Sequence, residues 1–299
     1  MTSRIAIIDG HHHIWRRADL PWLEGPMVPR IFGPYEAIRR DYPIAEFRAD
    51  LAGSGVVASV YVQTNWPAAR ALDEVAWVQS VSDATGWPQA IVGYADLAAP
   101  DIAALLDAEQ RHPALRGIRQ QLHWHAEEQY RLAARPDLAA DPQWRRGFAE
   151  LAPRGLLFEL QLFAPQMPAG AALARAFPET IIVLEHAGMP ADTSPAGQAA
   201  WRAGMRLLAD CANVHVKLSG LGTFTHRAAL DEMKPIIRTT VDLFGADRCL
   251  WGSNFPVEKL WTSYADLIAT FRAAIADFSL SDQRRILGET AARLYRLAA

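Results

Sequence analysis

Three consecutive histidines stand at the end of a short apolar run near the start of the chain. The run reads Ile-Ile-Asp-Gly-His-His-His and ends in His11, His12 and His13. Successive side chains of an extended chain point to opposite faces, so His11 and His13 share one face and His12 takes the other. Two neutral imidazoles on one face can bind a divalent cation or polarise a carbonyl group. A purification tag would precede the fold rather than end a strand, so we interpret the pair as part of a site.

A third histidine, His186, ends another apolar run with the sequence Ile-Ile-Val-Leu-Glu-His. Alternation places His186 on the same face as Ile182 and Leu184, which we expect to be the inward face. If that strand lies near the first one, its imidazole converges on His11 and His13. We therefore predict that these three histidines form the catalytic centre and, where a metal is bound, supply its ligands.

Polar and charged side chains interrupt three further apolar runs. Glu159 either pairs with a cation such as Lys217 or Arg119, or acts as a ligand or base. Lys217 is costly to bury unless it meets a carboxylate, which could belong to the protein or to a substrate. The planar fork of Arg119 matches a substrate carboxylate, although it could equally brace Glu159. Gln121 and His123 share the face of Arg119 and are candidate substrate contacts.

Aromatic residues follow several of these runs. Trp15, Trp22, Trp66 and Trp124 lie on or just after the expected strand ends. Bulky aromatic side chains at such positions can wall a pocket and exclude water from it. We expect Trp15, Trp66 and Trp124 to contact the substrate.

The elements that must position these residues form a regular alternation. Eight short apolar runs, rich in β-branched residues, cover 5–9, 56–63, 90–95, 115–121, 156–162, 180–186, 213–218 and 248–252. Segments with helical spacing separate most of them, at 68–85, 101–111, 142–152, 170–177, 195–210 and 227–244. Alternating strands and helices imply a parallel sheet, and eight strands close a (β/α)₈ barrel of the α/β class. A doubly wound open sheet would show the same alternation and remains the alternative.

Two long segments break this spacing, at 11–43 and 123–141. Both follow the ends of expected strands. In a barrel such loops lie on the catalytic face, so we expect both to shape a substrate pocket.

The composition of the chain limits which kinds of partner we expect it to bind. The chain has 299 residues, within the range of one barrel, and we expect a single domain over 1–299. The 30 basic and 33 acidic residues nearly balance, which argues against nucleic acid. No apolar stretch approaches a bilayer span and no signal-like segment opens the chain, so we expect no membrane contact and a cytoplasmic location. A small molecule is the expected partner, and a homo-oligomer is compatible with the sequence.

Four motifs taken together resemble the amidohydrolase superfamily. They are Asp-x-His-x-His at the first strand, His186 followed by Ala-Gly-Met-Pro, Lys-Leu-Ser-Gly from Lys217, and a final Gly-Ser-Asn-Phe-Pro. More narrowly, the sequence is similar to the lactonase branch, which holds 2-pyrone-4,6-dicarboxylate lactonase and sugar lactonases such as fuconolactonase. The likeness runs over nearly the whole chain and implies an amidohydrolase-type barrel enzyme that opens a cyclic ester with water.

One position departs from the family pattern. The resemblance implies that imidazoles or a single divalent metal polarise the lactone carbonyl, while an aspartate of the last motif acts as general base. Here Asn254 takes that place, and a carboxamide cannot accept a proton from water. Another acid such as Glu159 or Glu258 could serve, the chemistry could differ, the barrel could bind without catalysis, or the asparagine could be an engineered substitution.

The function that we expect is hydrolysis of a small lactone, a carboxylated sugar-acid or aromatic-breakdown compound, with Arg119 and Lys217 holding its anionic group. The cofactor is either none or one divalent metal, zinc first, at His11, His13 and His186. The rival functions are a lactone isomerase, a non-oxidative decarboxylase, and a non-catalytic ligand-binding barrel.

Overall fold

Eight parallel strands form the centre of the molecule. The computed structural model describes residues 5–297, and its single sheet has the order β1 to β8. The strands are β1 (Ile7–His12), β2 (Val56–Val62), β3 (Ala90–Gly93), β4 (Leu115–Arg119), β5 (Leu157–Leu160), β6 (Ile182–Leu184), β7 (Val214–Leu218) and β8 (Cys249–Trp251). Seven of the eight expected runs contain one strand each, the first run overlaps β1, which continues to His12, and the (β/α)₈ prediction is confirmed.

Backbone hydrogen bonds join the C-terminal end of β1 to the residues that follow β8. Asn254 N donates to the carbonyl oxygen of His11 and His13 N donates to that of Phe255, both at 2.7 Å. These bonds bring the histidine motif of β1 beside the Gly-Ser-Asn-Phe-Pro motif. The segment after β1 and the segment after β8 are thus joined at the mouth of the barrel.

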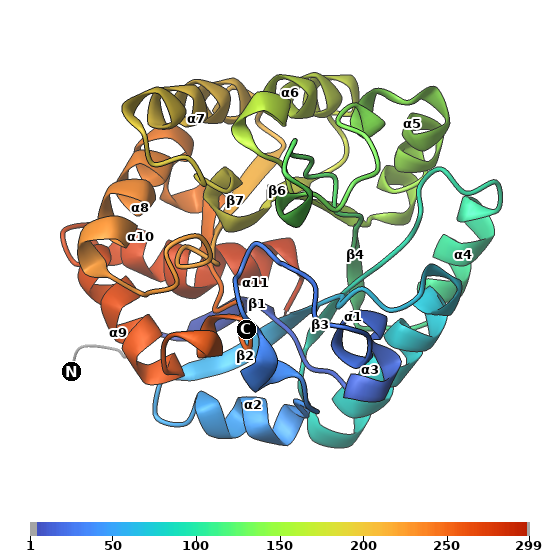
Figure 1. The fold of residues 1–299 in the computed structure, drawn as a ribbon, viewed down its shortest axis with the longest axis horizontal. Coiled ribbons are helices and arrows are strands. Elements are labelled where there is room, and N and C mark those ends of the chain that lie inside the picture. Colours follow the sequence, from blue (N-terminus) through green and yellow to red (C-terminus); the bar gives the residue numbers. More distant parts are fainter. Residues whose placement is uncertain (1–4, 298–299) are drawn as a thin grey trace.

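Helices surround the strands, as Figure 1 shows. They are α1 (Pro21–Glu24), α2 (Ile44–Asp50), α3 (Ala71–Thr85), α4 (Ile102–Glu109), α5 (Pro142–Ala149), α6 (Met167–Ala176), α7 (Pro195–Ala209), α8 (Leu230–Phe244), α9 (Tyr264–Ala274), α10 (Leu280–Arg284) and α11 (Thr290–Leu294). Side-chain caps begin some of them: Asp141 accepts from the backbone of Gln143 and Trp144 at the start of α5. No helix within residues 5–297 has the length and hydropathy needed to cross a bilayer.

The apolar core has two layers. The inner layer fills the barrel with small and branched side chains from alternate strand positions, among them Val60, Val92 and Val183. Leu294 and Tyr295, from the C-terminal helical segment, pack into the same layer. The larger outer layer lies between strands and helices and contains most of the buried aromatic residues. This arrangement leaves the opposite, C-terminal ends of the strands free to carry a site.

The strand β6 corrects one expectation about inward faces. Val183 belongs to the inner layer, whereas Ile182 and Leu184 belong to the outer one. The expected inward face of β6 was therefore wrong, because the run was assigned from its terminal histidine rather than from the pleat of the strand itself.

Candidate active site

Three imidazoles meet at the mouth of the barrel. The ring centroid of His11 lies 5.0 Å from that of His13 and 4.9 Å from that of His186. His12 points the other way and stacks on Phe47 of α2, with ring centroids 3.8 Å apart. The alternation within the histidine motif is as predicted, and side chains from β1 and from the end of β6 converge on one place.

His186 reaches this place through its backbone rather than through strand alternation. His186 and Ala187 both have left-handed backbones, with φ of 54° and 50°. Such angles are uncommon for residues other than glycine and turn the chain sharply. The turn carries the His186 ring toward β7, where its Nδ1 lies 3.0 Å from the hydroxyl of Ser219.

Burial keeps these imidazoles neutral. Desolvation, together with the charges of Arg119 and Lys217, lowers the pKa of His186 to about 3. Desolvation likewise holds the pKa of His11 and of His13 well below the usual value. Each ring therefore has one protonated nitrogen and one lone pair at neutral pH.

Hydrogen bonding fixes which nitrogen of His13 carries the proton. Its Nδ1 lies 2.7 Å from the carbonyl oxygen of Val62. A carbonyl only accepts, so Nδ1 donates and Nε2 keeps its lone pair. His13 is thus a neutral proton acceptor at the mouth of the barrel.

A pocket opens directly above the imidazoles. It encloses about 740 Å³, part of it open to solvent, and two of the three imidazoles line it. Its lining residues are His13, Trp15, Trp22, Arg30, Ile31, Phe32, Gln63, Thr64, Asn65, Arg119, Gln121, Gln161, His186, Met189, Gly220, Thr223, Phe224, Asn254 and Val257. His11 is not among them and is completely buried beneath His13 and His186. The lining contains no aspartate or glutamate.

The pocket contains only part of the predicted substrate contacts. Arg119, Gln121 and Trp15 line it, together with Trp22. His123 is 4% exposed and lies outside the lining, packed edge-on against the ring of Phe163.

Two predicted tryptophan contacts lie elsewhere. Trp66 stacks on Trp77 and under the guanidinium of Arg70, outside the pocket. Trp124 lines a separate shallow depression with residues of the 123–141 loop. The first long loop therefore shapes the pocket as expected, through Trp15, Trp22 and its neighbours at 30–32, while the second does not.

Charged side chains form a closely packed group beneath the imidazoles. Lys217 Nζ lies 2.6 Å from both carboxylate oxygens of Glu159, and Tyr295 donates to Glu159 at 2.7 Å. Arg119 Nη1 contacts both oxygens of Glu185, at 3.2 and 3.1 Å. Glu159 thus pairs with Lys217, one of the two partners considered, and Arg119 braces Glu185 rather than Glu159. Lys217 is fully buried in this group, away from the pocket, so it does not hold a substrate anion there.

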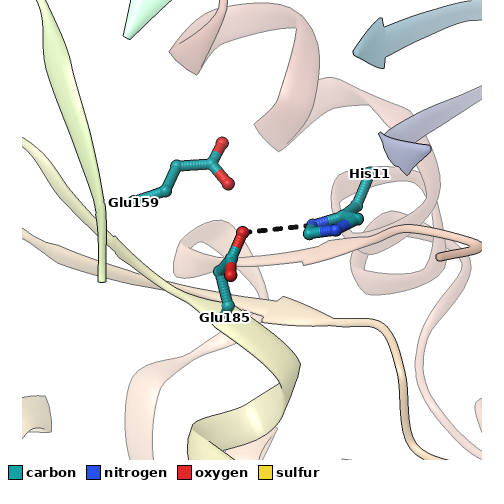
Figure 2. Close-up of side chains that lie close together, drawn as sticks. All are labelled: His11, Glu159 and Glu185. Carbon is teal, nitrogen blue, oxygen red and sulfur yellow. Dashed lines mark ion pairs between the residues drawn. The ribbon is translucent and has the colours of Figure 1, made fainter. Parts of the chain in front are cut away.

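Glu185 is a site residue that the sequence analysis missed. Its Oε1 lies 3.4 Å from His11 Nδ1, and Figure 2 shows both side chains facing Glu159. Glu185 shares the inward face of Val183 in β6, so reading that strand from its pleat would have found it.

Part of the charged group has the donors of a metal site. His11, Glu159 and Glu185 each offer a ligand atom, and these atoms lie within 4.8 Å of one another. Imidazole and carboxylate donors suit a divalent ion such as zinc, so donor type and spacing are consistent with a metal. This set differs from the predicted trio of His11, His13 and His186. The ammonium of Lys217 already lies against Glu159 and 3.4 Å from His11 Nδ1, so the set as it stands accommodates an ammonium rather than a metal ion.

Asn254 lines the pocket where the family pattern has an acid. Its backbone is left-handed, with φ of 57°, a conformation that asparagine and aspartate tolerate better than most residues. Its side chain interacts with that of Glu258, which is fully buried. Burial raises the pKa of Glu258 to about 8, so this carboxyl holds its proton at neutral pH and is not a free base.

Buried neutral imidazoles below a pocket at the C-terminal ends of the strands are the arrangement of a barrel enzyme. The amidohydrolase family model matches residues 8–297, and the chain belongs to this family. An uncharacterized protein of Sinorhizobium fredii is 38% identical, covering 99% of this chain and all of that protein. An L-fucono-1,5-lactonase of Burkholderia ambifaria is 32% identical, covering 99% of this chain and 97% of the lactonase. The expected likeness to sugar lactonases is confirmed.

A solved structure supports the same family. An amidohydrolase from Burkholderia multivorans with bound zinc is 30% identical and has a TM-score of 0.82, covering 98% of this chain and 100% of that one. The chain is therefore a hydrolase of the amidohydrolase family.

Proposed function

We propose that this enzyme hydrolyses a carboxylated lactone, with His13 accepting the proton of the attacking water. The observation that carries the proposal is the bond from His13 Nδ1 to the carbonyl of Val62, which leaves Nε2 unprotonated at the pocket wall. The water oxygen adds to the lactone carbonyl carbon while Nε2 takes its proton. The ring C–O bond then breaks, and the imidazolium returns the proton to the leaving alkoxide, giving a hydroxy acid.

The lowered pKa of His13 suits this role at neutral pH, because it keeps Nε2 free of a proton before the substrate arrives. Negative charge then develops on the carbonyl oxygen and stabilises the imidazolium that forms beside it. Neither of the two carboxyls considered as a base is both unprotonated and free of a partner at the pocket wall. Glu159 is held by Lys217, and Glu258 is protonated.

Arg119 is the group best placed to stabilise the developing oxyanion. Nη1 is fixed by Glu185 and Nη2 donates to the carbonyl oxygen of Gln63, while Nε has no partner among the described groups. A cation held in place before the reaction stabilises charge without reorganising during it. The second pocket imidazole, His186, lies on the same wall.

The charge of the pocket indicates a carboxylated substrate. Arg30 and Arg119 line it, and no acidic side chain does. Glu185 compensates Arg119, but among residues 5–297 no carboxylate forms an ion pair with Arg30. An uncompensated guanidinium on a pocket wall favours an anionic ligand, since its planar fork matches a carboxylate. A sugar-acid or aromatic-derived lactone with a free carboxylate meets this requirement.

The test is a pair of variants of adjacent histidines. His13→Asn removes the proton acceptor, and we expect kcat on a carboxylated lactone to fall about 10²- to 10⁴-fold, the usual contribution of general-base catalysis. His12→Phe is the control, because it keeps an aromatic ring stacked on Phe47 and lies outside the pocket. Turnover is measured by proton release. Wild-type turnover in a folded His13→Asn protein would overturn the assignment of the base.

A further inference from the structure

Five buried side chains from five strands form the charged group under the pocket. They are His11 on β1, Arg119 on β4, Glu159 on β5, Glu185 directly after β6, and Lys217 on β7, and none is more than 3% exposed. Figure 2 shows His11, Glu159 and Glu185 turned toward one another. A buried group of this kind must balance its charge internally, because no water screens it.

The group is balanced without any added ion. Its two carboxylates face two cations, with Arg119 on Glu185 and Lys217 on Glu159. The formal charges of these four groups sum to zero. A divalent ion bound in addition would leave two uncompensated positive charges in a site closed to water, which is strongly unfavourable.

Lys217 Nζ also occupies the space that a metal would need. It lies 2.6 Å from both oxygens of Glu159 and 3.4 Å from His11 Nδ1. These are atoms of two of the three residues that could together hold an ion. Zinc binds carboxylate oxygens and imidazole nitrogens at about 2.0–2.2 Å. An ion at that distance from the same atoms would overlap the ammonium.

We propose that the Lys217 ammonium is the resident cation of this group, that it excludes a divalent metal from His11, Glu159 and Glu185, and that removing it creates a zinc site. The inference goes beyond lactone hydrolysis and does not depend on it. Without the ammonium, two carboxylates and one imidazole remain around an open position. The formal charges that remain in the group then sum to −1. His11 Nε2 has no partner among the described groups, so no hydrogen bond at Nε2 prevents the ring from offering the lone pair of Nδ1 to a metal.

The experiment measures zinc content after equilibration with zinc and dialysis. Lys217→Ala is expected to retain one more zinc ion per chain than the wild type. The extra ion is expected to disappear in Lys217→Ala/Glu159→Gln, which removes one ligand. Zinc should raise the Tm of Lys217→Ala and leave that of the wild type unchanged, since a ligand that binds only the folded state stabilises it. Lys234→Ala is the control, because this lysine pairs with Asp277 on the surface.

Lys217→Met provides a second variant if the alanine protein does not fold, because it keeps most of the side-chain volume without the charge. The wild type gives an independent test. If it retains zinc that Glu159→Gln removes, the metal displaces the ammonium and the proposal is wrong. The proposal also fails if folded Lys217→Ala and Lys217→Met retain no more zinc than the wild type.

Discussion

Single side chains decide what chemistry this pocket supports. Asn254 removes the acid that the family pattern places there, and the buried Glu258 behind it holds its proton at neutral pH. His13 and His186 are the neutral imidazoles on the pocket wall, and the bond to Val62 directs the lone pair of His13 to Nε2. The proposed mechanism therefore uses a base that follows the first strand of the barrel instead of the last.

Arg30 offers a test of substrate charge. Arg30→Gln is expected to raise KM for a carboxylated lactone about tenfold, equivalent to ~1.4 kcal/mol, with kcat nearly unchanged. The reason is that Arg30 lines the pocket and is proposed to bind the substrate carboxylate, whereas Arg119 is proposed to face the reacting carbonyl. Steady-state kinetics on a carboxylated and a neutral lactone of similar size measure the effect, and only the first should respond.

Arg70→Gln is the matched control, because Arg70 lies over Trp66, outside the pocket. An equal rise in KM for the neutral lactone would show that Arg30 shapes the pocket rather than binding charge.

Residue alternation predicted much of the site but not all of it. It placed His11 and His13 opposite His12, while the cost of burying Lys217 indicated a carboxylate partner, which is Glu159. It failed at β6, because the left-handed backbone of His186 lies outside any strand pattern. Trp66 and Trp124 were misplaced because a position after a strand does not determine where a loop side chain turns.

The packing of secondary-structure elements affects the site most where β1 lies against the segment that follows β8. A Cβ atom added at Gly252 would lie 2.6 Å from His11 Cβ and 2.8 Å from His11 N. A Cβ at Gly10 would lie 2.7 Å from the carbonyl oxygen of Trp251. The absence of side chains at these two positions lets the strands approach and sets the position of His11.

Gly252→Ala should therefore displace His11 as well as destabilise the fold. We expect a loss of about 1–3 kcal/mol in the free energy of unfolding, the usual cost of overpacking, and a clear fall in kcat. Urea unfolding and the lactone assay measure the two effects.

Gly53→Ala separates stability from geometry. Its added Cβ would meet no atom within 4 Å, but its φ of +78° strains any side chain. This control should lose stability and keep full kcat. If Gly252→Ala also keeps full kcat, the close approach does not position the site.

The order of elements was largely predictable, because each strand of a parallel barrel is a short apolar run and each connection is amphipathic. The short helices α1 and α2 were not predicted, since α1 lies within the first long segment, α2 begins directly after it, and both have seven residues or fewer. Their place follows from packing: Phe47 of α2 covers His12. Such contacts cannot be read from local spacing.

At the scale of the whole molecule, buried titratable groups limit stability on both sides of neutral pH. Burial lowers the pKa of His123 and His186 from 6.5 to about 3. The folded state then binds fewer protons than the unfolded state below pH 6.5, so stability falls as the pH drops. Burial raises the pKa of Glu109 and Glu258 from 4.5 to about 8. The unfolded state releases these protons first, so stability also falls as the pH rises toward 8.

The prediction is a Tm that declines from about pH 6.5 to pH 8, where the histidines no longer offset the loss, partly through Glu109, whose two carboxylate oxygens have no partner within residues 5–297. Glu109→Gln keeps the shape and removes the charge, so its Tm should decline less between neutral pH and about pH 9. Glu128→Gln, an exposed site, is the control and should follow the wild type. Parallel curves for Glu109→Gln and wild type would remove Glu109 from this explanation.

The central claim is that neutral imidazoles in this pocket direct water onto a lactone carbonyl. The most direct measurement is the mass of the product formed from a carboxylated lactone in ¹⁸O-labelled water. We predict an open hydroxy acid with one labelled oxygen in the new carboxylate. A product with the mass of the substrate, as a lactone isomerase would give, or release of carbon dioxide, as a decarboxylase would give, would contradict the account. So would unchanged substrate with every carboxylated sugar-acid and aromatic-derived lactone tested.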